Sequence, residues 1–147
     1  MTFLRFLALL ATGCYLAAGM AHLAALPNKI GIPADAYLTV QQIYRGWAAF
    51  GFLLFAALVT IFALVILDWR KSRPFALELA ALLLLAASLG VFFTWTEPAN
   101  VATKHWTMLP ENWEQVRASW EYSHAAAACL VLLAFSTLVL ASIRHSA

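Results

Sequence analysis

Four long apolar stretches dominate the pattern of hydrophobic and polar positions along the chain. They cover residues 3–26, 42–67, 75–95 and 120–143. Each has roughly the 20 residues that a helix needs to cross the hydrocarbon core of a bilayer. None alternates strictly between apolar and polar residues as the strands of a membrane barrel do, and a helix satisfies its backbone hydrogen bonds within one segment. The pattern therefore predicts four membrane-spanning helices.

With their flanking residues, the predicted helices cover residues 3–26, 36–69, 75–96 and 112–144. Of the 147 residues, 64% are hydrophobic and only 11% are charged, and the mean hydropathy is +0.82. A chain of this composition has too little polar surface to cover a soluble globule. We expect an all-α fold, a single integral membrane four-helix bundle over residues 1–147 with no second domain.

The first apolar stretch also has some features of a secretory signal peptide. Arg5 would be its positive region, and a lipobox-like sequence ends at Cys14. A lipobox has leucine three residues before the cysteine, whereas this chain has Ala11, and the apolar run continues past Cys14. We therefore interpret this stretch as a retained helix.

The charged residues near the ends of the predicted helices favour one orientation. Four spans place both termini on one side, which carries Arg5, Arg70, Lys71, Arg73 and Arg144. The opposite side carries Lys29, Arg45, Lys104 and Arg117, together with the acids Asp35, Glu97, Glu111, Glu114 and Glu121. Basic residues in short loops collect on the cytoplasmic side of a membrane. We predict cytoplasmic termini, with outward loops over residues 27–38 and 98–112.

We predict that every unusual polar residue lies at the outward end of the bundle, together with many aromatic residues. On the last helix, one stripe contains Trp113, Arg117, Trp120, Glu121, His124 and Ala128. On the first helix, a second stripe contains Thr12, Tyr15, Gly19 and His22. Residues three and four apart share one face of a helix. The two stripes therefore predict one site that contains both His22 and His124.

Simpler roles compete with this interpretation for several residues. Tryptophans such as Trp47, Trp69 and Trp95 collect at membrane interfaces because they are amphipathic. Arg117 with a neighbouring glutamate is typical of an ordinary helix ion pair. The two histidines differ, because each lies about one turn inside an apolar run, where an ionisable group is costly and is a functional candidate by default.

The residue types in the predicted site allow three kinds of chemistry. Glu121 and His124 form an E-x-x-H pair of the kind that supplies metal ligands from one helix. With His22, and with Glu97 or His105, they would suit a single transition metal. Two facing histidines could instead hold a haem axially. Without any cofactor, a histidine beside a carboxylate is a general base for an acidic organic substrate.

The sequence around this site resembles the bacterial, unknown-function branch of the anthrone oxygenase-like membrane proteins. The resemblance rests on Glu97-Pro98-x-Asn100, Trp106, Trp113, Arg117 and "WEYSH" at residues 120–124, and on "AHLAALPNKIGIPADAYLTVQQIYRGW" at residues 21–47. Asn100, Trp113, Trp120 and His124 match the family pattern position by position. The resemblance implies a four-helix membrane bundle, oxidation of anthrones to anthraquinones with molecular oxygen, and no evident cofactor. It also implies a bacterial inner membrane, and the charges near the helix ends then predict that the site faces the periplasm or exterior.

These observations favour an oxygenase-like or other redox enzyme whose hydrophobic, aromatic substrate enters from the lipid bilayer. His124, oriented by Glu121, would remove a proton, and Arg117 or Arg45 would stabilise the resulting oxyanion. The substrate-binding residues would be His22, Gln42, Arg45, Asn100, Trp106, Trp113 and Trp120, with the 98–112 loop as a lid.

Two other functions compete with the enzyme hypothesis. The first is a haem- or metal-binding membrane protein that uses His22 and His124. The second is an accessory subunit, in a homo-oligomer or a larger membrane complex, that packs through the small-residue run "SHAAAAC" at residues 123–129. Nucleic-acid binding is not expected, because a net charge of +2 is spread over two faces.

Overall fold

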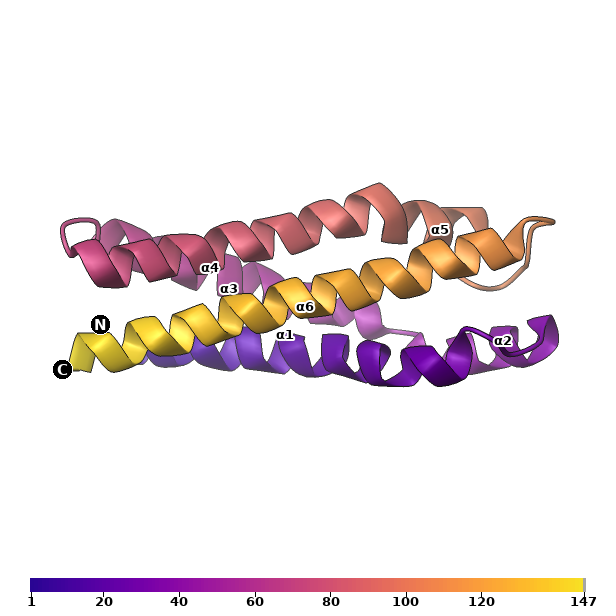
Figure 1. Cartoon of the computed structure of the whole chain (residues 1–147), viewed down its shortest axis with the longest axis horizontal. Coiled ribbons are helices and arrows are strands. Elements are labelled where there is room, and N and C mark those ends of the chain that lie inside the picture. The colour runs from indigo at the N-terminus through magenta and orange to yellow at the C-terminus, as the bar shows by residue number, and fades with distance from the viewer. Residues whose placement is uncertain (147) are drawn as a thin grey trace.

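The computed structural model describes residues 1–146, without the side chains of residues 72, 145 and 146; Ala147, the last residue of the predicted domain, lies outside it. Four long helical segments run side by side in an all-α bundle (Figure 1), which confirms the predicted fold class. The segments Thr2–Lys29, Trp47–Leu67, Arg73–Ala102 and Trp113–Arg144 are long and apolar enough to cross a membrane.

The first helix extends further than the sequence predicted. Helix α1 (Thr2–Lys29) passes through Pro27, where we expected a turn. Pro27 removes one backbone donor close to the end of the helix, but the helix continues, and Ile30 donates its backbone N–H to the Leu26 carbonyl at 3.1 Å. The extra turn brings Lys29 into the bundle, where it is buried.

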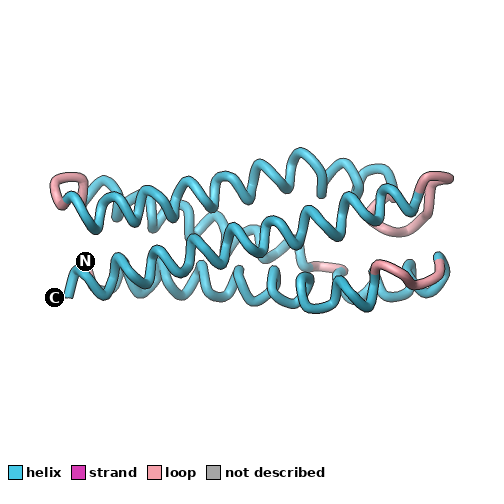
Figure 2. Tube along the Cα trace, in the orientation of Figure 1, coloured by secondary structure: helices cyan, strands magenta, loops and turns pink. Residues whose placement is uncertain are grey.

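The prediction of one continuous second helix over residues 36–69 is wrong. The structure has α2 (Ala34–Gln41), two short 3₁₀ turns (Gln42–Tyr44 and Trp47–Ala49) and α3 (Phe50–Leu67). Figure 2 shows the loop that joins the two 3₁₀ turns. The interruption centres on Gly46, whose φ is 87°. A left-handed residue ends a right-handed helix, and glycine adopts that conformation without a steric cost.

The third predicted helix, residues 75–96, ends too early. Helix α4 (Ser72–Val91) continues through a π-helical turn, η3 (Phe92–Thr96), into α5 (Glu97–Ala102). Pro98 indicated a helix end in the sequence, but a proline is tolerated in the first turn of a helix, and Pro98 lies at the start of α5. The last helix, α6 (Trp113–Ser146), matches the predicted range of 112–144 closely.

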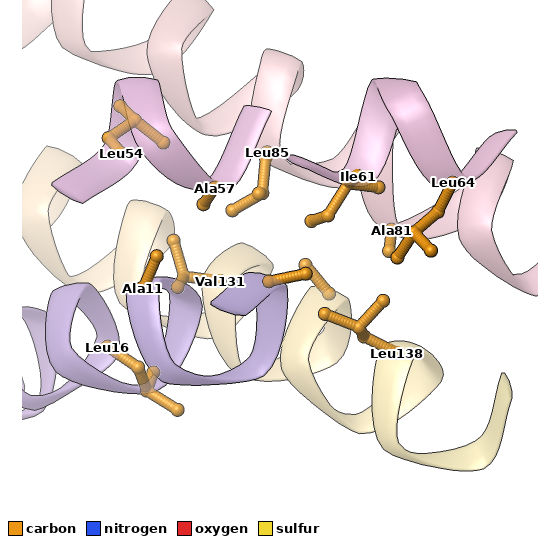
Figure 3. Close-up of a cluster of buried hydrophobic side chains, with 12 residues drawn as sticks. Ala11, Leu16, Leu54, Ala57, Ile61, Leu64, Ala81, Leu85, Val131 and Leu138 are labelled. Carbon is orange, nitrogen blue, oxygen red and sulfur yellow. The ribbon is translucent and has the colours of Figure 1, made fainter. Parts of the chain in front are cut away.

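Two clusters of buried side chains hold the bundle together. Small and branched apolar residues fill its middle, and Figure 3 shows Ala11, Leu54, Ala57, Ile61, Leu85, Val131 and Leu138 among them. The second cluster lies toward the loop end and contains Tyr37, Ala99, Trp106 and Trp120. Aromatic packing thus replaces aliphatic packing near the predicted site.

The two ends of the bundle differ in what they carry. The termini and the α3–α4 turn lie at one end, and the α1–α2 and α5–α6 connections lie at the other (Figure 1). The expectation that every unusual polar residue lies at the second end is wrong, because Arg5, Asp68 and Glu78 are buried at the first. Arg5 pairs with Asp68 and, at 2.7 Å, with Glu78. Lys71 also pairs with Asp68, at 3.0 Å. Buried charges inside an apolar bundle persist when they are paired in this way.

Candidate functional site

A cavity of about 800 Å³ lies in the half of the bundle toward the α1–α2 and α5–α6 connections. Its wall includes residues of α1, α3, α6, the η3 turn and the segments that precede α3 and follow α5. Sites for small organic molecules usually have volumes of about 300–1,000 Å³. The volume and the largely apolar lining therefore suit an organic ligand.

The two histidines meet at the wall of this cavity, as the two sequence stripes predicted. The ring centroids of His22 and His124 are 4.2 Å apart, in an edge-to-face arrangement. The His22 ring also stacks on Tyr44 at 4.3 Å, and Trp120 lies 4.2 Å from His124. Rings from α1, η1 and α6 thus form one continuous aromatic cluster around the imidazoles.

The close approach of α1 and α6 depends on small residues one turn away from the histidines. A Cβ atom placed on Gly19 would lie 3.3 Å from the Cβ of Ala128. Small residues let helix backbones approach closely in membrane bundles. Gly19 and Ala128 therefore allow the contact between His22 and His124, and the small-residue run of α6 is used for packing inside the bundle.

Two buried polar atoms at the cavity have no hydrogen-bond partner among the described residues. They are Nδ1 of His22 and Oε1 of Gln41. Both residues line the cavity, and His22 is only 8% exposed. Buried polar atoms in proteins are rarely left without a partner. Both atoms are almost fully covered by other atoms, so a ligand in the cavity would reach them only if a side chain moved.

Glu121 lies behind the cavity wall and does not line it. Its carboxylate pairs with Lys29 at 2.9 Å and accepts a hydrogen bond from the Tyr37 hydroxyl at 2.8 Å. Gln41 donates to the same hydroxyl. Burial and the nearby Glu121 charge raise the pKa of Tyr37, so its hydroxyl keeps its proton and donates. These contacts tie α1 and α2 to α6, and no hydrogen bond between Glu121 and His124 is found in the described part of the chain.

Arg117 is also held away from the cavity. Its Nη1 donates to the Ile32 carbonyl at 2.7 Å. Its guanidinium lies over the rings of Trp113, at 4.5 Å, and Tyr37, at 5.4 Å. Neither Arg117 nor Trp113 lines the cavity, so the structure does not bring them to the predicted substrate. The arginine that lines it is Arg45, which donates to Gln42 at 2.9 Å.

Asn100 connects the lid to α6. Its Oδ1 accepts the indole N–H of Trp120 at 2.8 Å and that of Trp106 at 3.2 Å. Its Nδ2 donates to Glu97 at 3.2 Å. All four residues line the cavity. Asn100, Trp106 and Trp120, which were predicted to bind substrate, are thus also bonded to one another.

The lid contains an unusual backbone turn. Lys104, His105 and Trp106 have φ values of 47°, 55° and 61°. This left-handed conformation costs roughly 1–2 kcal/mol for each residue with a side chain. The turn is held by the burial of Trp106 and by Gln42, whose Nε2 donates to the Trp106 carbonyl at 3.0 Å. Strained turns of this kind cluster at functional sites.

The geometry does not suit a metal or a haem. Among the described residues, no three histidine, cysteine, aspartate or glutamate side chains gather closely enough to hold a metal ion. The candidates Glu97 and His105 line the cavity, whereas Glu121 does not. Axial histidines of a haem lie on opposite sides of the macrocycle, and rings 4.2 Å apart leave no space for it.

The sequence interpretation missed Lys29, Tyr37 and Gln41 as parts of the site. Lys29 was placed in a loop, although it lies seven residues after His22 and so continues the same helix face. Tyr37 and Gln41 are four residues apart on α2, which also indicates a shared face. No family model, curated protein or solved structure matches this chain.

Proposed function

We propose that the protein is an oxygenase-like membrane enzyme that acts on a hydrophobic aromatic molecule in this cavity. The observation that carries the proposal is the contact between His22 and His124 at the wall of a largely apolar cavity. An imidazole in a water-poor pocket is suited to remove a proton from an organic substrate. The resemblance to the anthrone oxygenase-like family supports the same reaction class.

The proposed reaction begins with proton transfer from a ring carbon of the substrate to His124. The electron pair of the broken C–H bond stays on the substrate, which becomes a phenolate-like anion. Arg45 is the cation that lines the cavity, and it takes the stabilising role first considered for Arg117. Molecular oxygen then oxidises the anion. With anthrone as substrate, one oxygen molecule is consumed, and the products are anthraquinone and one water molecule.

The first prediction concerns His124. Purified protein in lipid nanodiscs should consume oxygen and form anthraquinone when anthrone is added, and His124→Ala should lower the rate roughly a hundredfold or more, as expected for loss of a general base. Tyr122→Phe is the matched control, because Tyr122 is exposed on the same helix, and it should keep the wild-type rate.

His124→Gln separates proton transfer from a structural role. Glutamine can form hydrogen bonds but cannot accept a proton near neutral pH. A glutamine variant as active as the wild type would exclude His124 as the base. Wild-type protein that neither binds nor oxidises anthrone or any aromatic alcohol would overturn the proposed function itself.

A further inference from the structure

The cavity opens on one side of the bundle only. Its exposed lining residues are Gln42, Arg45, Gly46, Ala48, Gly51, Phe55, Phe93, His105 and Thr107. They lie in the stretch from η1 to α3, in η3, or in the lid after α5. The lining residues of α1 and α6 are buried or half-buried. The opening is therefore a slit between α3 and the α4–η3–α5 segment.

The slit runs from a polar rim into an apolar region. Gln42, Arg45, His105 and Thr107 form the rim near the loops. Phe55 and Phe93, which are 68% and 62% exposed, flank it within the apolar spans. Side chains exposed at this level of a membrane-spanning bundle face lipid. The cavity is thus accessible from the bilayer as well as from the loop end.

The interior of the cavity also has a polar part and an apolar part. At the level of the histidines it is lined by the polar side chains of His22, His124 and Gln41. Deeper in the bundle its lining is apolar, with Leu54, Leu58, Leu89, Phe92, Ala127, Ala128 and Val131, and Tyr15 adds one hydroxyl. Val131 lies seven residues beyond His124, roughly 10 Å along a helix that rises about 1.5 Å per residue. A planar ring at the histidines leaves this deeper region unfilled.

We propose that the occupant is an aromatic alcohol with a hydrocarbon tail, which enters sideways from the bilayer through the slit between α3 and η3. The inference rests on the proposed function, which places the ring at the histidine pair. The ring packs against His22 and His124, and the tail extends along Leu58, Leu89 and Val131, which all line the cavity. The π-helical turn shapes this wall, since Phe92 and Phe93 both line the cavity, and π turns are frequent at functional sites.

The tail determines orientation more than affinity. It leaves lipid for an equally apolar wall, and the hydrophobic effect contributes little to such a transfer within a membrane. The test is therefore the position of the tail. The probe is a hydroquinone whose decyl chain ends in a photoreactive diazirine, added to the protein in nanodiscs, with the labelled residues mapped by mass spectrometry.

We expect the diazirine to label the deep wall around Leu54–Leu58, Leu89–Phe93 and Val131, and an excess of unlabelled decyl hydroquinone to suppress this labelling. Ala127→Leu should abolish it, because Ala127 lines the cavity. Ala126→Leu, an exposed neighbour on α6, is the matched control and should not change it. Ala18→Leu fills the cavity from α1 and serves if the first variant does not fold.

Three outcomes would overturn the inference. Labelling at the lid around Trp106 would mean that the tail points the other way, although an aromatic substrate could still be oxidised at the histidines. If a decyl diazirine without the ring labels the deep wall equally well, and if His22→Ala does not change this labelling, the cavity binds only lipid chains. Displacement of the probe by tail-free anthrone with no labelling of the deep wall would leave the proposed function standing and exclude the tailed substrate.

Discussion

At the scale of single residues, helical spacing predicted correctly which side chains share a helix face, but it did not predict their hydrogen-bond partners. Thr12 and His22 on α1, and Trp120 and His124 on α6, face inward as predicted. Spacing could not show that Glu121, on the same stripe as His124, bonds to Lys29 and Tyr37 behind the cavity. The partner of a buried carboxylate depends on which residues other segments bring to it, and the predicted helix that should have carried Lys29 ended at Leu26. Spacing therefore predicted that His22 and His124 lie together, but it missed the hydrogen bonding and included Glu121, Arg117 and Trp113, which do not line the cavity.

A second prediction tests Asn100 as the connection between the lid and α6. Asn100→Leu removes the acceptor of two indole N–H groups, on Trp106 and Trp120, whose side chains are almost fully buried. Leaving a buried donor without a partner costs about 1–3 kcal/mol. The melting temperature should therefore fall by several degrees in a thermal unfolding assay followed by tryptophan fluorescence.

Val101→Leu provides the control for this change, because Val101 is the next residue on α5 and is 63% exposed. It should leave the melting temperature unchanged. If Asn100→Leu also leaves the melting temperature unchanged, the two indoles do not depend on Asn100, and other contacts must hold the lid.

At the scale of elements, apolar runs predicted where helices exist but not where they are interrupted. The run over residues 36–69 gave no sign that Gly46 adopts a left-handed conformation, since glycine is also tolerated within apolar helices of membrane proteins. The π-helical turn was equally hidden, because Phe92–Thr96 contains no glycine or proline. Both irregular segments border the cavity. Sequence reasoning thus failed where the backbone departs from regular geometry to form the site.

A third prediction concerns the packing of α1 against α6. Gly19→Leu would place a side chain against Ala128, where even a Cβ atom approaches within 3.3 Å. Overpacking of this kind typically costs about 1–3 kcal/mol, so the melting temperature should fall and the two histidines should separate.

Gly90→Leu is the matched change on α4, where an added Cβ would meet no atom within 4 Å. Leucine is a better helix former than glycine by up to about 1 kcal/mol. Gly90→Leu should therefore be neutral or stabilising. Equal effects of the two substitutions would exclude close packing at Gly19 as the basis of the contact between the histidines.

At the scale of the whole molecule, exposed charged side chains are distributed unequally between the two ends of the bundle. Several of the basic residues first counted are buried, among them Arg5, Lys29 and Arg117. The exposed basic side chains are Arg70, Lys71, Arg73 and Arg144 at the end with the termini, and Arg45 and Lys104 at the end with the site. Exposed acids lie at the site end, on Asp35, Glu111 and Glu114. The orientation with cytoplasmic termini stays a prediction, which rests on the general preference of basic residues for the cytoplasmic side.

The last prediction tests this orientation directly. Cys14 and Cys129 are the cysteines of the chain, and replacing both with alanine gives a background for single-cysteine labelling. In intact cells, a membrane-impermeant maleimide should label Glu111→Cys, at the site end, and should label Lys71→Cys only after the membrane is opened. Both positions are exposed, so a difference between them reports the side of the membrane and not burial. The reverse result would place the polar rim of the cavity in the cytoplasm. It would leave the sideways access between α3 and η3 unchanged, because that opening lies within the spans, and it would then require a substrate whose polar ring resides at the cytoplasmic face of the bilayer.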